Sequence, residues 1–248
     1  MQSQQTGTSQ RCCIMLTDIN GTHWVPLWPL QWLSYTCLLL QSDTMDEKRN
    51  LDIFAGAGIR IPRYEIVKIG ERPKLFPAER YVIKALSKNI VHKTDMGAVR
   101  KDVEKESVEV EMRRMRNRLE KYGIEGFLIQ EQVQRGVEVI IGAKRDAQMG
   151  DVVLFGLGGV YVELYRDVSV RLCPLSTADA LEMIDETKAA RIFAGFRGAE
   201  PIDKGMVAGI IKKVCSIMHN NPDIKEIDLN PVVLYPTSYY TVDVRVIR

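Results

Sequence analysis

The alternation of hydrophobic and polar residues becomes regular after residue 44, and from there it predicts both helices and strands. Residues 46–57 have a helical pattern that the following glycines bring to an end. Residues 59–68 alternate as a strand does, and Pro62 restricts that strand to the edge of a sheet. Residues 80–85 form a short apolar run, which predicts a buried strand.

The rest of the chain continues to mix the two patterns. Ser107 is a candidate N-cap for a helix over residues 108–122, in which apolar residues recur at spacings of four and three and which Gly123 ends. Further strands and helices follow the same reasoning, at residues 99–103, 126–133, 137–143, 152–155, 177–187, 201–219, 224–235 and 239–247. Ser176 and Thr177 are candidate caps of the helix at 177–187. Because the order lacks a regular βαβ rhythm, we expect the α+β class rather than a doubly wound sheet.

Residues 1–44 differ from the rest of the chain. They are rich in Gln, Ser and Thr, and their apolar stretch at 23–40 is interrupted by prolines and Gln31. A transmembrane helix needs about 20 mostly apolar residues, and a signal peptide needs a basic segment directly before its apolar core. Three interpretations stay open: an upstream extension added by gene calling, with Met45 as the true start; a disordered or loosely docked extension; and a targeting segment. We favour the first and assign no function to this leader.

The composition is that of an ordinary soluble protein. Hydrophobic residues make up 46% of the 248 residues, enough for one core or two small lobes. The net charge of +2 and the pI near 8.2 give no field that would favour nucleic acid or a membrane as a partner. The five cysteines are odd in number and lack metal-ligand spacing, so we expect free thiols in a reducing, cytoplasmic compartment.

Carboxylates gather in the last two predicted strands. Because side chains on a strand alternate between faces, Asp228 and Asn230 lie on one face. A tight turn centred on residues 236–237 would place Asn230 opposite Asp243. The same register would place Asp228 opposite Arg245. Two carboxylates and an amide oxygen are ligands of the kind that Mg²⁺ binds, and the competing interpretation is a solvated polar face.

Two further residues are candidates for phosphate chemistry. Lys84 stands at the end of the apolar run 80–85, as either an ordinary strand-end lysine or a point charge for phosphate. His92 follows in the polar segment 92–97. A lone histidine is most often structural, but such a loop can bring an imidazole to a phosphoryl group, with lysine offsetting charge and aspartate orienting the ring.

These motifs together resemble those of one enzyme family. The run D-L-N-P at 228–231, with D-V-R at 243–245, is similar to the magnesium motif of succinyl-CoA synthetase β subunits and of the related ADP-forming acyl-CoA synthetases. The run H-K-T-D-M-G at 92–97 resembles their phosphohistidine loop, although Ala98 stands where the family commonly has a second glycine. The resemblance covers residues 50–248 and implies an ATP-grasp fold, with the nucleotide between two lobes.

The resemblance implies roles for single residues. It implies that Mg²⁺ is bound by Asp228, Asn230 and Asp243. It also implies that Lys84 contacts the phosphates of ATP or ADP. His92 would then be a transient phosphohistidine, which relays phosphate from a partner subunit to ADP.

Further matches extend the expected nucleotide site. Arg245 either reaches a phosphate or pairs with Asp228. Residues 126–142 are similar to the hinge and adenine strand of ATP-grasp enzymes, which implies that Glu131 lies near the base and Glu138 near the ribose or the metal. As bare sequence, both glutamates are ordinary strand charges, although a carboxylate buried at Glu138 would need a partner.

Residues 156–159 form a glycine cluster. It is neither a Walker loop nor a Rossmann fingerprint. Glycines let backbone amides approach an anion closely, and the surrounding residues resemble the family. We therefore assign Gly158, Gly159 and Arg171 to the phosphate end of the site.

The resemblance finally implies an activity and a division into lobes. The family reaction is acyl-CoA + ADP + phosphate ⇌ carboxylate + ATP + CoA, which makes the chain part of an acid–thiol ligase. After the leader 1–44, the small lobe is expected at 45–131, with the phosphohistidine loop, and the large lobe at 132–248, with the magnesium hairpin. A CoA-binding α subunit in an α₂β₂ assembly is the expected partner.

Three other functions are alternatives. The same domain occurs fused in protein acyltransferases. The chain could also be a non-catalytic nucleotide-binding or assembly module, or an independent carboxylate–amine ligase. The last leaves His92 without a role, and the intact set of His92, Asp228, Asn230 and Asp243 argues against the second, so we expect the synthetase.

Overall fold

The computed structural model describes residues 13–18, 21–26, 44–90, 96–158, 167–195 and 198–248. The chain divides into two compact units, Met1–Leu38 and Leu39–Arg248. In the first unit, β1 (Cys13–Asp18) and β2 (Gly21–Pro26) form an antiparallel hairpin. The three interpretations of residues 1–44 stay predictions. No helix in the described ranges is long and apolar enough to cross a membrane.

Four strands of the second unit form an antiparallel sheet that we call the small sheet. In spatial order they are β3 (Tyr64–Lys68), β6 (Gly126–Glu131), β4 (Tyr81–Leu86) and β5 (Val99–Val103). The predicted strand at 80–85 is confirmed as β4, which is buried along its whole length. The edge position of β3 agrees with the presence of Pro62, although the strand itself begins only at Tyr64.

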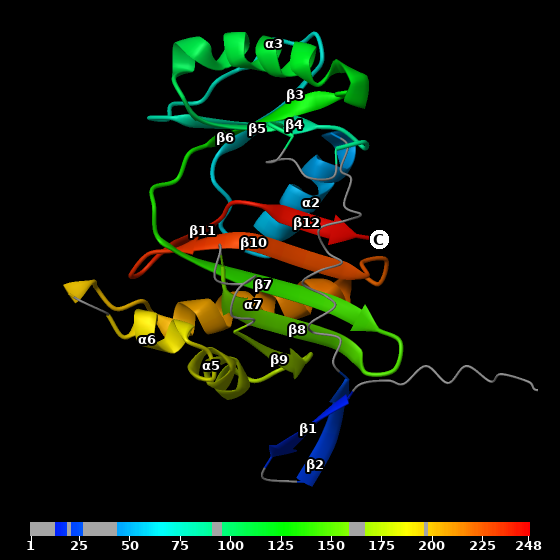
Figure 1. The fold of residues 1–248 in the computed structure, drawn as a ribbon, viewed down its shortest axis with the longest axis vertical. Coiled ribbons are helices and arrows are strands. Elements are labelled where there is room, and N and C mark those ends of the chain that lie inside the picture. Colours follow the sequence, from blue (N-terminus) through cyan, green and yellow to red (C-terminus); the bar gives the residue numbers. More distant parts are fainter. Residues whose placement is uncertain (1–12, 19–20, 27–43, 91–95, 159–166, 196–197) are drawn as a thin grey trace, which may run out of the picture. The chain divides into compact units, whose positions relative to one another are not determined.

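Helix α3 (Val108–Arg118) packs on one face of the small sheet, as Figure 1 shows. Its core-facing residues keep the predicted spacing: Val108, Met112, Met115 and Leu119. Ser107 precedes the helix, but its side chain makes no capping hydrogen bond. The predicted cap is wrong because the backbone of Ser107 is already helical, at the end of the short 3₁₀ turn η1 (Lys105–Ser107). A second such turn, η2 (Glu120–Tyr122), follows α3.

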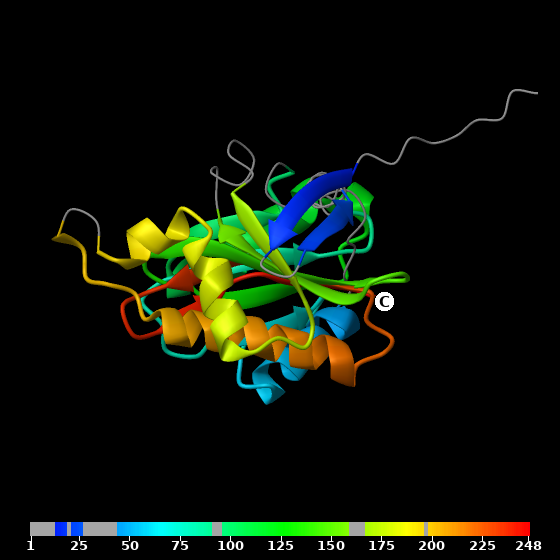
Figure 2. The same cartoon turned by 90° about the horizontal axis from the view of Figure 1, so that it is seen from below.

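The other six strands form a second antiparallel sheet, which we call the large sheet. In chain order they are β7 (Val137–Asp146), β8 (Gly150–Leu157), β9 (Val168–Leu172), β10 (Glu226–Leu234), β11 (Tyr239–Thr241) and β12 (Val244–Ile247). The order across the sheet is β11-β10-β7-β8-β9, and β12 also pairs with β10. Helices α5 (Thr177–Asp185), α6 (Ala189–Phe193) and α7 (Lys204–Asn220) cover one face, as Figure 2 shows. Of these elements, β9 and α6 were not predicted.

Helix α2 (Thr44–Gly56) confirms the predicted helix at 46–57 but packs in an unexpected place. Its buried residues Leu51 and Phe54 belong to the core beneath the large sheet. The helix lies beside β12 and also contacts β3 (Figure 1). The first residues of the expected small lobe, 45–131, therefore pack with the large sheet. The helical pattern showed that α2 buries one face, but it did not show against which sheet.

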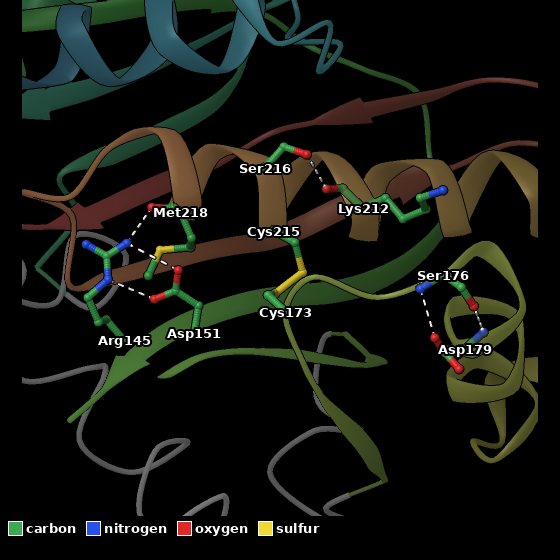
Figure 3. The surroundings of a disulfide bond; sticks show 9 residues. All are labelled: Arg145, Asp151, Cys173, Ser176, Asp179, Lys212, Cys215, Ser216 and Met218. Atoms are coloured by element: carbon green, nitrogen blue, oxygen red, sulfur yellow. Dashed lines mark hydrogen bonds and ion pairs between the residues drawn. A yellow bond between two sulfur atoms is a disulfide. The ribbon is translucent and has the colours of Figure 1, made fainter. Parts of the chain in front are cut away.

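A disulfide joins Cys173, just after β9, to Cys215 in α7 (Figure 3). Their Cα atoms lie 5.5 Å apart although 42 residues separate them in the sequence. The expectation of free thiols is wrong for this pair, because spacing along the chain does not show which cysteines the fold brings together. Beside the disulfide, Arg145 pairs with Asp151 at 2.8 Å and donates to the carbonyl of Met218 near the end of α7.

The N-terminus of α5 provides a test of local stability. Ser176 Oγ accepts from the Asp179 amide at 3.1 Å, and the Asp179 carboxylate accepts from the Ser176 amide at 2.8 Å (Figure 3). We predict that Ser176→Ala lowers the free energy of unfolding by about 1 kcal/mol, because the Asp179 amide loses its acceptor. Urea unfolding measures the change. The control is Ser216→Ala, at an exposed position in the middle of α7, where we expect the free energy of unfolding to change by less than about 0.5 kcal/mol. Equal losses of stability in both variants would contradict the capping role of Ser176.

The disulfide provides a second test. We predict that its reduction lowers the free energy of unfolding by about 4 kcal/mol, because the Cys173–Cys215 bond closes a long loop, with a sequence separation of 42, in the unfolded chain. The measurement is urea unfolding with and without dithiothreitol. The Cys215→Ser variant is the control, since its stability should not depend on the reductant. An unfolding midpoint that stays constant when the wild-type protein is reduced would refute the prediction.

Candidate functional site

Lys84 connects the two sheets. It stands on β4, and its side chain is only 7% exposed. Its ammonium donates to the carbonyl oxygen of Val242 at 2.8 Å and to Asp243 at 3.1 Å. Val242 and Asp243 lie between β11 and β12 of the large sheet. A buried ammonium requires such partners, so this contact fixes the two sheets to each other at one point.

The C-terminal strands meet in the predicted register. Asp228 of β10 pairs with Arg245 of β12. The amide of Asn230 donates to the backbone carbonyl of Asp243 at 3.3 Å. Both predicted pairings are therefore confirmed. The predicted final strand is divided into β11 and β12, and Asp243 lies in the interruption between them.

The charged side chains at this point act on one another. Asp243 accepts from Lys84 on one side and from Arg245, at 3.0 Å, on the other. Burial raises the pKa of Asp228 to about 7. The positive charge of Arg245 opposes this rise in the pKa, while the negative charges of Asp243 and Glu226 add to it. The carboxylate of Asp228 is therefore poorly stabilised as an anion.

The same cluster offers the donors that Mg²⁺ prefers. Asp228 and Asp243 supply carboxylate oxygens, and the exposed Asn230 supplies an amide oxygen. Within the described ranges, no group of three or more His, Cys, Asp and Glu side chains could hold a metal ion. Mg²⁺ is usually held by one or two carboxylates together with phosphate oxygens and water. A cation beside Asp228 would also offset its unfavourable burial. These residues fit a magnesium ion that arrives with a nucleotide.

The expected base and ribose contacts stand on β6 and β7. Glu131 ends β6 and forms a two-point ion pair with Arg63, at 2.9 and 3.0 Å. The hydrogen bonds from Arg63 lower the pKa of Glu131. Glu138 is exposed on β7, so the concern that a buried carboxylate there would need a partner does not apply. Contacts of Glu131 and Glu138 with a nucleotide stay predictions.

The glycine cluster has a structural role at one position. The amide of Gly158 donates to the carbonyl of Glu138 at 2.8 Å. A Cβ at Gly158 would lie 3.0 Å from the carbonyl carbon of Glu138, which is crowded. The close approach of β7 therefore favours glycine here, and in this structure the amide is already used. Gly159 lies outside the described residues.

Two further predicted residues lie away from the Lys84 contact or outside the described ranges. Arg171 on β9 forms an ion pair with Glu186, and it lies 3.5 Å from Glu182. These carboxylates already neutralise its charge, so a phosphate contact of Arg171 stays a prediction. His92 lies within residues 91–95, outside the part of the chain that the structure describes.

Two buried polar residues near the Lys84 contact were not predicted. Gln130 on β6 is 1% exposed and Thr241 on β11 is fully buried. Their side-chain polar atoms have no hydrogen-bond partner among the residues that the structure describes. Gln130 shares a face of the small sheet with Lys84, because Lys84 pairs with Leu128, two residues before Gln130. The sequence signal that could have marked Gln130 is a polar residue two positions after Leu128, on the same face of an otherwise apolar strand.

Asp228 gives a prediction for the effect of pH. In the unfolded chain its pKa is near 3.9, so between about pH 4 and 7 only the folded state keeps the proton. Rising pH through this window therefore removes the stability that protonated Asp228 contributes. We predict that Asp228→Asn, which does not titrate, gains about 2–4 kcal/mol relative to wild type between pH 4 and 7. Urea unfolding in EDTA buffers measures it, and parallel pH profiles of the two proteins would contradict the assignment.

Comparison of the amino-acid sequence with known proteins identifies the family of this chain. The ATP-grasp domain family matches residues 38–247. The β subunit of acetate–CoA ligase (ADP-forming) I from Pyrococcus furiosus is 39% identical over 198 residues, which cover 77% of this chain and 85% of that subunit. Acetate–CoA ligase (ADP-forming) I from Archaeoglobus fulgidus is 37% identical over 205 residues. These cover 79% of this chain, which spans only 30% of the length of that longer protein.

A solved structure agrees with the sequence relatives. It is the Ca. Korarchaeum cryptofilum dinucleotide forming acetyl-coenzyme A synthetase 1 in complex with coenzyme A and Mg-AMPPCP, with its phosphohistidine segment pointing towards the nucleotide binding site. The match has a TM-score of 0.69 and 38% identity, and it covers 81% of this chain and 90% of that one. The α+β class and the ATP-grasp fold are thereby confirmed. The chain belongs to the ATP-grasp family and, within it, to the β subunits and domains of the ADP-forming acetate–CoA ligases.

Proposed function

We propose that this chain is the nucleotide-binding β portion of an ADP-forming acyl-CoA synthetase, which catalyses acyl-CoA + ADP + phosphate ⇌ carboxylate + ATP + CoA. The proposal is carried by the contact of Lys84 with Asp243 at 3.1 Å, beside the paired Asp228 and Arg245. This contact gathers two cations and two carboxylates where the two sheets meet, and we propose that these groups bind phosphate and metal. The ligase names of the relatives from Pyrococcus and Archaeoglobus support the same assignment.

Lys84 and Arg245 would hold the phosphates of the nucleotide. Phosphoryl transfer needs positioning and charge neutralisation more than covalent chemistry from the protein. Lys84 supplies a point charge from a rigid strand, whereas Arg245 supplies a planar set of donors. Mg²⁺, held by Asp228, Asn230 and Asp243, would neutralise charge on the phosphate oxygens when bound.

His92 would be the relay between the two half-reactions. In the ATP-forming direction, an oxygen of the ADP β-phosphate attacks the phosphorus of phosphohistidine. A P–O bond forms as the P–N bond breaks, and the electron pair returns to the imidazole nitrogen. In the reverse direction the imidazole nitrogen attacks the γ-phosphorus of ATP, and ADP leaves. The Korarchaeum protein, whose phosphohistidine segment points towards its nucleotide site, supports this role by analogy.

The proposal includes a CoA-binding α subunit as partner, in an α₂β₂ assembly. The Pyrococcus relative is named a β subunit. The Archaeoglobus relative has a much longer chain, of which this chain spans 30%. The Korarchaeum structure is in complex with coenzyme A. Because the reaction uses nucleotides and CoA esters, we place the enzyme in the cytoplasm.

The relay can be tested by labelling. With Mg²⁺ and ATP labelled at the γ-phosphate, the protein should gain an acid-labile phosphate on His92. His92→Asn should abolish the label but leave ADP affinity within about twofold, because the imidazole meets only the transferred group. Asp243→Asn should slow labelling by about 100-fold, because it removes a carboxylate ligand of the Mg²⁺ that would neutralise charge on the phosphates. Asp185→Asn, which removes a surface carboxylate paired with Lys204, is the control and should label normally.

Two outcomes would refute the proposal. Label that persists in His92→Asn would exclude this histidine as the relay. A wild-type protein that binds ATP but gains no label would instead be a nucleotide-binding assembly module. When the CoA-binding partner is added, the wild-type protein should form ATP from acyl-CoA, ADP and phosphate, and His92→Asn should not.

A further inference from the structure

The end of α3 and the turn η2 that follows it hold the residues on the N-terminal side of the His92 segment. Ser87 Oγ donates to the carbonyl oxygen of Tyr122 at 2.5 Å. Asn89 Nδ2 donates to the same carbonyl at 3.2 Å, and the Asn89 amide donates to Ser87 Oγ at 3.0 Å. Ser87 and Ile90 are fully buried. The chain is therefore firmly held up to the last residue before 91.

The same helix end holds the residues on the C-terminal side of this segment. The guanidinium of Arg118 donates to the carbonyl oxygen of Gly97. Gly97 has a φ of +65°, and a Cβ there would lie 3.0 Å from a nitrogen of Arg118, so glycine allows this contact. Ala98 is fully buried, and its carbonyl accepts from the Ala85 amide of β4 at 2.8 Å. Ala98 does not have a positive φ, so a second glycine is not required by the backbone at this position.

We propose that Arg118 and Ser87 are positioning residues for phosphoryl transfer, which hold the two ends of the His92 segment on one helix end. This inference rests on the proposed function of His92. The two contacts therefore limit where the imidazole can meet a phosphoryl group.

Arg118 differs from Arg113 and Arg114, two other arginines of α3. Arg114 pairs with Glu111 on the same helix. Arg113 is exposed and has no ion pair or hydrogen bond within the described part of the chain. Of these three, Arg118 is the one that contacts Gly97 within the part of the chain that the structure describes. Its planar fork of donors can hold a carbonyl in a fixed direction, and its charge is favourable at the C-terminal end of a helix.

The test compares matched arginine variants in the full chain with its CoA-binding partner present. We expect Arg118→Ala to slow single-turnover labelling of His92 by ATP, and kcat for ATP formation, by about 10-fold or more. The KM and Kd for ADP should stay within about twofold, since Arg118 does not contact the nucleotide site. Arg118→Lys, which keeps a donor, should recover part of the rate, and Arg113→Ala should behave as wild type.

Ser87→Ala is the second variant, because it removes the other anchor without changing α3. It should also lower kcat without raising KM. Rates of Arg118→Ala and Ser87→Ala equal to that of Arg113→Ala would overturn the proposal. So would a parallel loss of ADP affinity and thermal stability, which would indicate a general structural role. If the wild-type protein itself takes no label on His92, the proposed function fails first and the positioning role fails with it.

Discussion

The single contact of Lys84 with Asp243 determines how the two sheets of this protein can work together. An ammonium that is 7% exposed must be paired, and within the described ranges the partners of Lys84 come from the other sheet. Removing either partner would leave a buried charge, which costs far more than the loss of a surface ion pair. The buried ion pair that joins the two sheets therefore lies within the candidate site itself.

That constraint also sets up a competition. Asp243 is held by Lys84 and Arg245 in this structure, and it is also a proposed ligand of Mg²⁺. A divalent cation at Asp243 would weaken its attraction for both side chains. Lys84 and Arg245 would then be available to the phosphates that arrive with the metal. The proposed roles of these three residues would thus couple the binding of the metal to the binding of the nucleotide.

Much of this site could be predicted from sequence, for reasons that are local. The register of Asp228 with Arg245 follows from the period of two along a strand and from one turn. The capping role of Ser176 follows from its spacing to Asp179. Other features depend on which distant surfaces meet, and they could not be predicted. The Cys173–Cys215 bond is one example, and the packing of α2 against the large sheet is another.

Predictions from resemblance have a different limit. The shared motif marks Gly158 as a candidate site residue. The structure gives a steric reason for glycine at this position, because the backbone of β7 approaches too closely for a side chain. Gln130 is a residue that the resemblance did not mark. Its side-chain amide is buried near Lys84 without a hydrogen-bond partner among the described residues, and only the structure shows this.

The position of α2 has a mechanical consequence. Because this helix packs with the large sheet, the chain passes to the small sheet between α2 and β3 and returns between β6 and β7. Two backbone connections, residues 57–63 and 132–136, therefore join the two sheets. Any rotation of one sheet against the other must therefore change backbone dihedral angles in both connections at once.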